Sequence, residues 1–328
     1  MPLPISSRRA RAPIVGLLFF LLLGLSPAFA APPARDVTIA ALNGPTAIGM
    51  LKLMADAPVV GSVHTRFEIV STPDLMVARL LSGSAQVGFL PLNLAANLSA
   101  KGVPIELAAT TGDGVLYVVT SLDGIKSIAD LRGKRLYNSE RGSTPEFVLD
   151  FVLEHEGLNP QRDLTVDYSY NHIELAQEAA AGRVDLAVLP EPFAAMAIAR
   201  NPRLHIVIDL QREWGAVTGT NTAYPTTAMV ITRSLGTNEP SVVEALLQAE
   251  KASIAWANSH PAEAGVLAQR YVGLPAQVVA AAMPRLNLRY VPAAAAKSAV
   301  VRFLTELDSF DPASIGGRLP DSGFYWSP

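Results

Sequence analysis

Residues 135–157, RLYNSERGSTPEFVLDFVLEHEG, decide the fold of this chain. They predict a strand over 135–139, a short polar turn and a helix that ends at Gly157. The helix start is marked twice. Thr144-Pro145 suits an N-cap followed by the first helical residue, and a serine and a glutamate three residues apart have capping-box spacing. The stretch is therefore predicted to be a strand followed by an amphipathic helix.

Residues 164–193, LTVDYSYNHIELAQEAAAGRVDLAVLPEPF, continue this pattern. Strict alternation of apolar and polar residues predicts a half-buried strand over 164–170. A helix over 173–181 and a buried strand over 184–189 follow, and this strand ends abruptly in Pro190-Glu191-Pro192. Two βαβ units in succession indicate a parallel sheet with helices on its faces.

The same pattern occurs about one hundred residues upstream. Asn43-Gly44-Pro45-Thr46 follows one predicted strand as Arg141-Gly142-Ser143-Thr144 follows another, and GFLPLNLAA (88–96) aligns with AVLPEPFAA (187–195). A duplicated unit predicts two similar lobes. Because ligands of open α/β sheets lie beyond the carboxyl ends of the strands, both repeats would offer their loops to one shared crevice. The alternative is a duplicated scaffold around an empty groove.

The remaining sequence predicts how these lobes are connected. The chain would cross between them twice, so that the fold class is α/β with two lobes, each a mostly parallel sheet flanked by helices, joined by a two-strand hinge. The first lobe would be discontinuous, 31–118 plus 222–328, and the second would be 119–221. The other expected elements are strands over 36–42, 64–70, 86–90, 105–109, 116–120, 205–210 and 226–232, a polar loop over 211–225, and helices over 46–54, from 240 onward, and over 262–271, 276–282 and 293–307.

Residues 1–30 have the features of a secretory signal peptide. Three arginines precede an apolar run over 14–25, and Ala28-Phe29-Ala30 is a small-x-small cleavage site. The run is too short to span a bilayer comfortably. The chain has no cysteine, which excludes a lipid-modified N-terminal cysteine, disulfides and thiolate chemistry. We therefore expect a protein free in the periplasm, exported by either the general or the twin-arginine route.

Little in the sequence indicates catalysis. The five histidines share no metal-ligand spacing, and the hydrolase, zincin and P-loop motifs are absent. The net charge is −3 and the sequence has no basic cluster, which argues against a nucleic-acid partner. We expect no catalytic residue, no metal, no cofactor and a monomeric protein.

The predicted crevice loops are better suited to holding a small molecule. Gly44 and Gly142 would allow the backbone to approach a ligand closely. Thr46, Ser143 and Thr144 present hydroxyls at helix N-termini, where free N–H groups favour carboxylate, sulfonate or phosphate oxygens. The same hydroxyls could instead serve only to cap their helices.

Other candidate residues each leave two alternatives open. Glu191 could receive a cationic ligand group, or it could pair with a basic residue across the hinge. Trp214 could stack on a planar ligand or pack in the core. Asn93, in the corresponding segment of the other repeat, can donate and accept hydrogen bonds. The predicted ligand-binding set is Asn43, Gly44, Pro45, Thr46, Pro91, Leu92, Asn93, Thr111, Gly142, Ser143, Thr144, Glu191 and Trp214.

The combination DLRGKR…GSTPEFVLDFVLEHEGL…AAAGRVDLAVLPEPFAAMA resembles the periplasmic substrate-binding proteins of the nitrate/sulfonate/taurine and thiamine-pyrimidine type, which are receptors of ABC importers. The resemblance covers about residues 36–328. It implies a two-lobed, type II-like fold that closes on its ligand, with a permease and an ATPase of the inner membrane as partners. The family's ligand contacts fall on residues 43–46, 91–93 and 142–144 and on Glu191.

Three classes of function remain: a receptor of an importer, a receptor that presents its ligand to a sensor kinase, and an enzyme on the same fold. The apolar residues that follow Thr46 and flank Asn93 favour a small organic ligand over an inorganic anion. A receptor that presents its ligand to a membrane sensor kinase would have the same sequence features as an import receptor. The fold also occurs in a pyrimidine synthase and a tetrapyrrole-forming deaminase, but both depend on cysteines that this chain lacks.

Overall fold

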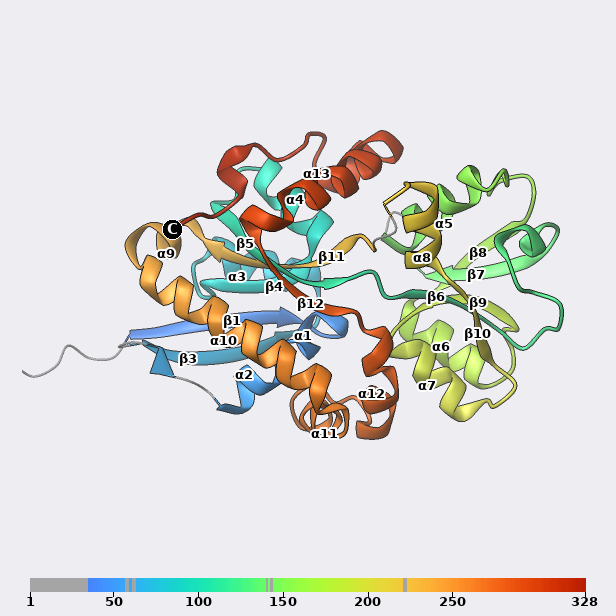
Figure 1. Cartoon of the computed structure of the whole chain (residues 1–328), viewed down its shortest axis with the longest axis horizontal. Helices are drawn as coiled ribbons and strands as arrows, with labels where there is room; N and C mark the ends of the chain where they lie inside the picture. The colour runs from blue at the N-terminus through green and yellow to red at the C-terminus, as the bar shows by residue number, and fades with distance from the viewer. Residues whose placement is uncertain (1–34, 57–58, 61–62, 140, 142–143, 221–222) are drawn as a thin grey trace, which may run out of the picture. The chain divides into compact units, whose positions relative to one another are not determined.

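The structure is a computed structural model that describes residues 35–56, 59–60, 63–139, 141, 144–220 and 223–328. Arg35–Pro328 forms one compact unit with two β-sheets, each flanked by helices (Figure 1). The predicted signal peptide lies outside the described residues. Within the described part of the chain, none of the helices combines the length and apolar character needed to cross a bilayer.

The first sheet has the strand order β12-β5-β11-β4-β1-β3-β2. Its parallel part is β3-β1-β4, with β1 in the centre. β11 pairs antiparallel with both β4 and β5, and the edge strands β12 and β2 are also antiparallel to their neighbours. The strands are β1 (Arg35–Leu42), β2 (Val59–Val60), β3 (Val63–Val70), β4 (Val87–Pro91), β5 (Ile105–Asp113), β11 (Pro225–Thr232) and β12 (Leu288–Pro292).

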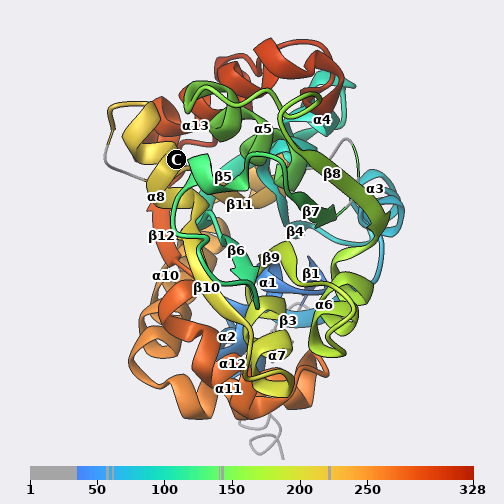
Figure 2. The same ribbon diagram turned by 90° about the vertical axis from the view of Figure 1, so that its right-hand side faces the viewer.

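The second sheet has the strand order β10-β6-β9-β7-β8. β7 (Arg135–Ser139) is central and runs parallel to β8 (Thr165–Tyr170) and β9 (Leu186–Pro190). β6 (Leu116–Thr120) pairs antiparallel with β9, and β10 (His205–Asp209) pairs antiparallel with β6. Figure 2 shows α6 and α7 on one face of this sheet and α5 and α8 on the other.

The duplication predicted from the sequence is present in the topology. The order β3-β1-β4-β11 in the first sheet corresponds to β8-β7-β9-β6 in the second, and in both a parallel set of three strands is followed by an antiparallel strand. The α/β class with two helix-flanked sheets is confirmed. The sheets are mixed rather than mostly parallel, because the strands next to the crossings run against the parallel set.

Helices fill the connections and the C-terminal third of the chain. Their starts are fixed locally: Asn171 and Glu174 form a reciprocal capping box at α6, and the Thr72 hydroxyl accepts the Leu75 N–H at α3. The helices are α1 (Pro45–Ile48), α2 (Leu51–Asp56), α3 (Pro73–Leu81), α4 (Leu92–Ala100), α5 (Thr144–His155), α6 (His172–Ala180), α7 (Phe193–Arg200), α8 (Leu210–Val217), α9 (Arg233–Asn238), α10 (Pro240–Ser259), α11 (Pro261–Tyr271), α12 (Ala276–Ala282) and α13 (Ala293–Phe310), with short 3-10 turns at Ile128–Leu131, Met283–Arg285, Pro312–Ile315 and Ser322–Phe324.

Three local predictions differ from the structure. The helix expected over 46–54 is interrupted at Gly49 into α1 and α2. The loop expected over 211–225 begins with α8, because the Asp209 carboxylate accepts two N–H groups at the helix start. The loop expected at 91–93 is absent, since β4 ends at Pro91 and α4 begins at the next residue.

An aromatic cluster joins helices of the two sheets. Trp214 of α8 lies 4.2 Å from the Phe151 ring of α5 and 5.6 Å from the Phe303 ring of α13, centroid to centroid. Tyr224, which precedes β11, stacks on Phe303 at 5.1 Å. Because Phe303 belongs to a helix that packs on β5, the cluster forms one continuous core with the second sheet.

Candidate ligand-binding site

The strand register brings the carboxyl ends of both parallel sets to the crossings between the sheets. The first crossing joins Asp113 of β5 to Leu116 of β6, and Leu116 is paired with Pro190 at the end of β9. The second crossing enters β11, where Thr227 is paired with Pro91 at the end of β4. The two carboxyl edges therefore meet the same part of the molecule.

The two crossings are themselves hydrogen-bonded side by side. Pro225 is paired with Asp113, and the Gly114 N–H donates to the Tyr224 carbonyl at 2.9 Å. The Gln211 side chain accepts the Leu116 N–H and donates to its carbonyl, at 2.7 and 2.9 Å. Every polar backbone group named here is thus satisfied within the protein, which fixes the frame around the candidate crevice.

In the first sheet, the candidate residues after β1 form a partly buried turn and a very short helix. Asn43 is exposed, and its N–H donates to the Val70 carbonyl. Gly44 has φ 122° and ψ −147°, a conformation that only glycine adopts readily, and a Cβ added there would meet no atom within 4 Å. Pro45 begins α1, and the Thr46 hydroxyl donates back to the Leu42 carbonyl at 2.5 Å.

The candidate residues at β4 and β5 divide into accessible and buried groups. Pro91 and Asn93 are partly exposed. Leu92 is fully buried in the core, and Thr111 in β5 is nearly so. Of this group, Pro91 and Asn93 are the ones that offer surface to a ligand.

In the second sheet, Thr144 begins α5 and is half-buried, whereas the predicted residues Gly142 and Ser143 lie outside the described part of the chain. The start of α5 is linked to the end of β7 by Asn138, whose side-chain amide donates to the Pro145 carbonyl at 3.1 Å. The Thr144 position is therefore fixed by the end of β7.

An acidic group that sequence reasoning missed lies further along α5. Asp150 of α5 is 9 % exposed, and its Oδ1 has no hydrogen-bond partner among the described residues. Burial, together with the charges of Glu146 and Glu154, raises the pKa of Asp150 to about 7. The Arg141 Cζ lies 4.6 Å from the Tyr168 ring centroid, and its Nη1 lies 3.8 Å from Glu146 Oε1. One cation therefore lies close to these acids.

Glu191 has protein partners on both carboxylate oxygens. Its Oε1 accepts the Nε–H of Arg285 at 2.5 Å, and its Oε2 accepts the Ala195 N–H at 3.0 Å. The residue is fully buried, and this burial raises its pKa although the Arg285 charge acts in the opposite direction. Of the two alternatives that the sequence left open, pairing with a basic residue is present in the structure.

Trp214 packs in the core. Its side chain is 3 % exposed and lies among Phe151, Tyr224 and Phe303. These neighbours occupy the space that a stacked ligand would need. The core alternative is therefore the arrangement that the structure shows for this residue.

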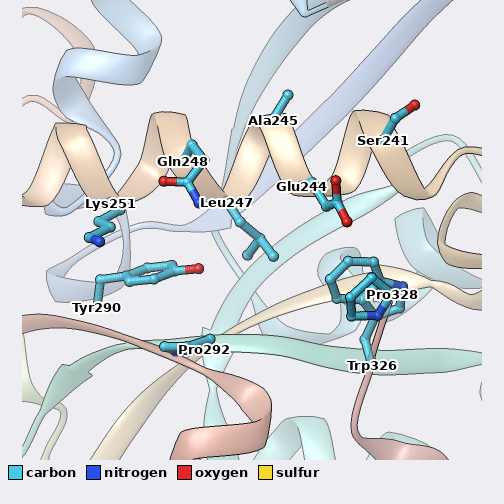
Figure 3. Close-up of a pocket in the computed structure, with 10 residues that line it drawn as sticks. All are labelled: Ser241, Glu244, Ala245, Leu247, Gln248, Lys251, Tyr290, Pro292, Trp326 and Pro328. Atoms are coloured by element: carbon cyan, nitrogen blue, oxygen red, sulfur yellow. The ribbon is translucent and has the colours of Figure 1, made fainter.

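Two hollows lie away from the predicted site. One, of about 650 Å³, is bounded by α10, β12 and the C-terminal residues, with Lys251 beside Tyr290 at one end and Glu244 beside Trp326 at the other (Figure 3). A second, of about 400 Å³, lies between α3 and α4. Neither is lined by a residue of the predicted ligand-binding set.

Residues 68–264 match the family model described as NMT1/THI5 like. The chain belongs to this family. No curated protein matches it by sequence.

Solved structures agree with this assignment. An ABC transporter protein from Parabacteroides distasonis is 29 % identical, with a TM-score of 0.78 over 89 % of this chain and 98 % of its own. The periplasmic aliphatic sulphonate binding protein SsuA from Escherichia coli is 16 % identical, with a TM-score of 0.69 over 91 % and 93 %. The periplasmic nitrate-binding protein NrtA from Synechocystis PCC 6803 is 12 % identical, with a TM-score of 0.61 over 86 % and 83 %, so the last two show the shared fold alone.

The family and these neighbours are solute-binding proteins of ABC importers, not enzymes. The resemblance inferred from the sequence is confirmed, as is the expectation that the chain is a binding protein rather than an enzyme.

Proposed function

We propose that this protein captures a small organic molecule between its two sheets, closes around it, and delivers it to the permease and ATPase of an inner-membrane importer. The observation behind this proposal is the strand register, since Pro91 and Pro190 end equivalent strands beside the two crossings. A ligand that touches both edges stabilises only the arrangement in which they are close.

The first lobe in this proposal is 31–118 plus 222–328, and the second is 119–221. The crossings between Asp113 and Leu116, and between α8 and β11, would be the hinge. The ligand contacts come from the segment after β1 (Asn43 to Thr46), from the junction of β4 and α4 (Pro91 and Asn93), and from the start of α5 (Thr144). The mature protein would begin at Ala31 in the periplasm and act as a monomer.

A small organic ligand suits these loops better than an inorganic anion. A Cβ added at Gly44 would meet no atom within 4 Å, and the Thr46 hydroxyl keeps its acceptor lone pairs after donating to Leu42. In the second lobe, Thr144 begins a helix whose first two turns carry the acids Glu146 and Asp150. This combination favours a neutral or cationic polar group on an organic body.

The test is mass spectrometry of small molecules released from the purified periplasmic protein. We expect one compound at a stoichiometry near one, which raises the melting temperature when added back and reduces the radius of gyration in solution scattering. A protein that carries no compound and shows no thermal shift with any metabolite of a broad library would contradict the proposal.

Delivery is tested separately from capture. Deleting the gene should abolish uptake of the identified compound, and uptake should return with the wild-type gene. Unchanged uptake together with loss of a transcriptional response to the compound would instead assign the protein to a sensor kinase.

A further inference from the structure

The segment Arg285–Arg289, here called the strap, runs along the first crossing between the sheets. The Asp113 N–H donates to the Asn287 carbonyl at 3.1 Å, and the Asn287 side-chain amide donates to the Gly114 carbonyl at 2.6 Å. Arg289 Nε donates to Asp113 Oδ2 at 2.7 Å. These bonds attach the strap to the end of β5 in the first sheet.

The other end of the strap is held by the second sheet. Arg285 Nε donates to Glu191 Oε1 at 2.5 Å, and the Tyr117 hydroxyl of β6 donates to the Arg285 carbonyl at 2.9 Å. The last two residues of the strap, Leu288 and Arg289, are also the first two of β12, which pairs with β5. It therefore makes a non-covalent connection between the sheets beside the two covalent crossings.

The backbone of the strap and of the crossing leaves little freedom. Asn287 has φ 47°, the left-handed conformation that few residues other than glycine and asparagine adopt. A Cβ added at Gly114 would lie 2.5 Å from Tyr224 Cζ, so the crossing is packed closely against its neighbours. We expect such a closely packed segment to keep one conformation, and to change to another in a single step when one of its hydrogen bonds is lost.

The pair at the end of the strap has an asymmetric environment. Glu191 is fully buried, whereas the Arg285 side chain is 34 % exposed. A buried carboxylate without its cation is strongly unfavourable, because a desolvated charge lacks compensation. If Arg285 is lost, Glu191 must therefore take up a proton or gain water, and a separation of the two sheets would supply that water.

We propose that the strap is a latch, in which the Arg285–Glu191 pair sets the distribution of distances between the two lobes and Arg285 positions the loop Pro190–Pro192 at the crevice. This proposal rests on the two-lobed capture function proposed above. Arg285 is a positioning residue, since it acts through Glu191 and not through contact with a ligand.

The absence of native cysteine makes a direct distance measurement practical. Spin labels at Lys101→Cys and Asp123→Cys, exposed positions beside the first and second sheets, report the interlobe distance in the full mature chain by pulsed electron resonance. The variants are Arg285→Gln, Arg285→Lys and the double variant Glu191→Gln/Arg285→Gln. Arg183→Gln is the matched control, because Arg183 Nε also lies 2.5 Å from a glutamate, Glu178, but within one lobe and at the surface.

In ligand-free protein at pH 8, we expect Arg285→Gln to increase the population with longer interlobe distances, relative to the population with the wild-type distance, by at least about tenfold. Arg285→Lys should restore part of the wild-type population. Acidification to pH 5 should return the Arg285→Gln distribution toward wild type, since the protonated Glu191 tolerates burial. The double variant should show no such pH response, and Arg183→Gln should match wild type.

A distance distribution of Arg285→Gln that equals wild type at both pH values would overturn the latch, whatever its melting temperature. An equal shift in Arg183→Gln would do the same. Neither outcome affects the capture function, which depends on the released compound and its thermal shift.

Discussion

The two parallel sets of strands, β3-β1-β4 and β8-β7-β9, share one topology but differ in the chemistry of the residues that follow β4 and β9. After β4, Pro91 is followed by Leu92, which is fully buried in the core. After β9, the equivalent Pro190 is followed by Glu191, which is just as buried but paired with Arg285. The same backbone frame therefore provides apolar packing on one side of the candidate crevice and an ionic connection on the other.

A second comparison concerns buried acids beside the helices that follow the central strands. In the first sheet, Glu250 of α10 lies against the α1–α2 junction, with its Oε1 3.1 Å from where a Gly49 Cβ would be. In the second, Asp150 belongs to α5 itself. Neither Oδ1 of Asp150 nor either carboxylate oxygen of Glu250 has a hydrogen-bond partner among the described residues. The two halves thus share an unpaired acid but differ in how deeply it is buried.

The largest effect is expected at Glu250, where burial alone raises the pKa to about 8. Because the folded state prefers the protonated form, stability from this group is fully present below about pH 4.5 and is lost as the pH rises through about 8. Glu250→Gln should remove this loss, worth on the order of 5 kcal/mol in the free energy of unfolding at pH 9. Urea titrations at pH 5 and pH 9 measure it, and an unchanged pH slope would mean that Glu250 is already paired.

Substitutions of Trp214 in the aromatic cluster test whether side-chain packing joins the helices of the two sheets. Trp214→Ala should lower the free energy of unfolding by about 4 kcal/mol, because it leaves a cavity among Phe151, Tyr224 and Phe303. Trp214→Phe keeps an aromatic ring and should cost clearly less. Both are measured by denaturant unfolding together with calorimetric titration of the released compound. Weaker binding by Trp214→Phe at unchanged stability would restore the ligand-stacking alternative.

Asp150 should behave like Glu250 but more weakly, because it is closer to the surface and to Arg141. Its pKa of about 7 means that stability from this group is present below about pH 4 and is lost as the pH rises toward about 7. The shift alone corresponds to about 4 kcal/mol. Solvent screening at this less deeply buried site reduces the expected effect, so Asp150→Asn should raise the free energy of unfolding at pH 8 by roughly 3 kcal/mol relative to pH 4. If the two substitutions had equal effects in the same urea titrations, burial depth would not determine how strongly each acid destabilises the protein at high pH.

The smallest effect is expected at Gly44. A methyl group there meets no protein atom within 4 Å, so the stability cost is backbone strain alone, about 1–2 kcal/mol at φ 122°. If a ligand lies against this backbone, Gly44→Ala should also weaken its binding by roughly tenfold in a calorimetric titration. Gly273→Ala is the control, since Gly273 also has positive φ and open space but follows α11. Equal affinities in both variants would place the ligand away from Gly44.

The repeat and the strand–helix alternation could be predicted from sequence because they depend on local spacing. The strand expected over 36–42 is β1, and the helix expected near Thr144 is α5. The missed helix α8 had a signal, since Asp209 is a good N-cap and Leu210 and Trp214 are four residues apart. Its glycine, Gly215, and its polar residues concealed that pattern.

The strap and the buried acids could not be predicted in the same way. Glu191 and Arg285 are far apart in the chain, and nothing local selects one arginine among many as the partner. Glu250 did have a signal: it lies on the apolar stripe of α10, seven residues after Val243 and four before Ile254. A charged residue on an apolar stripe predicts a buried charge, but only the structure shows that it is unpaired.

The insertion of the second sheet between β5 and β11 has a consequence for the order of folding. Strands β6 to β10 are contiguous in sequence, so the second sheet can form as soon as that segment is available. The first sheet cannot close until Ile105 meets Thr232, and β12 joins it later still. Pairing between segments that are distant in sequence is slow. We therefore expect the edges of β4 and β5 that pair with β11 to remain unpaired after the second sheet has formed. The late-arriving strap would then complete the hinge only after both sheets exist, which makes it the last part of the frame to be built.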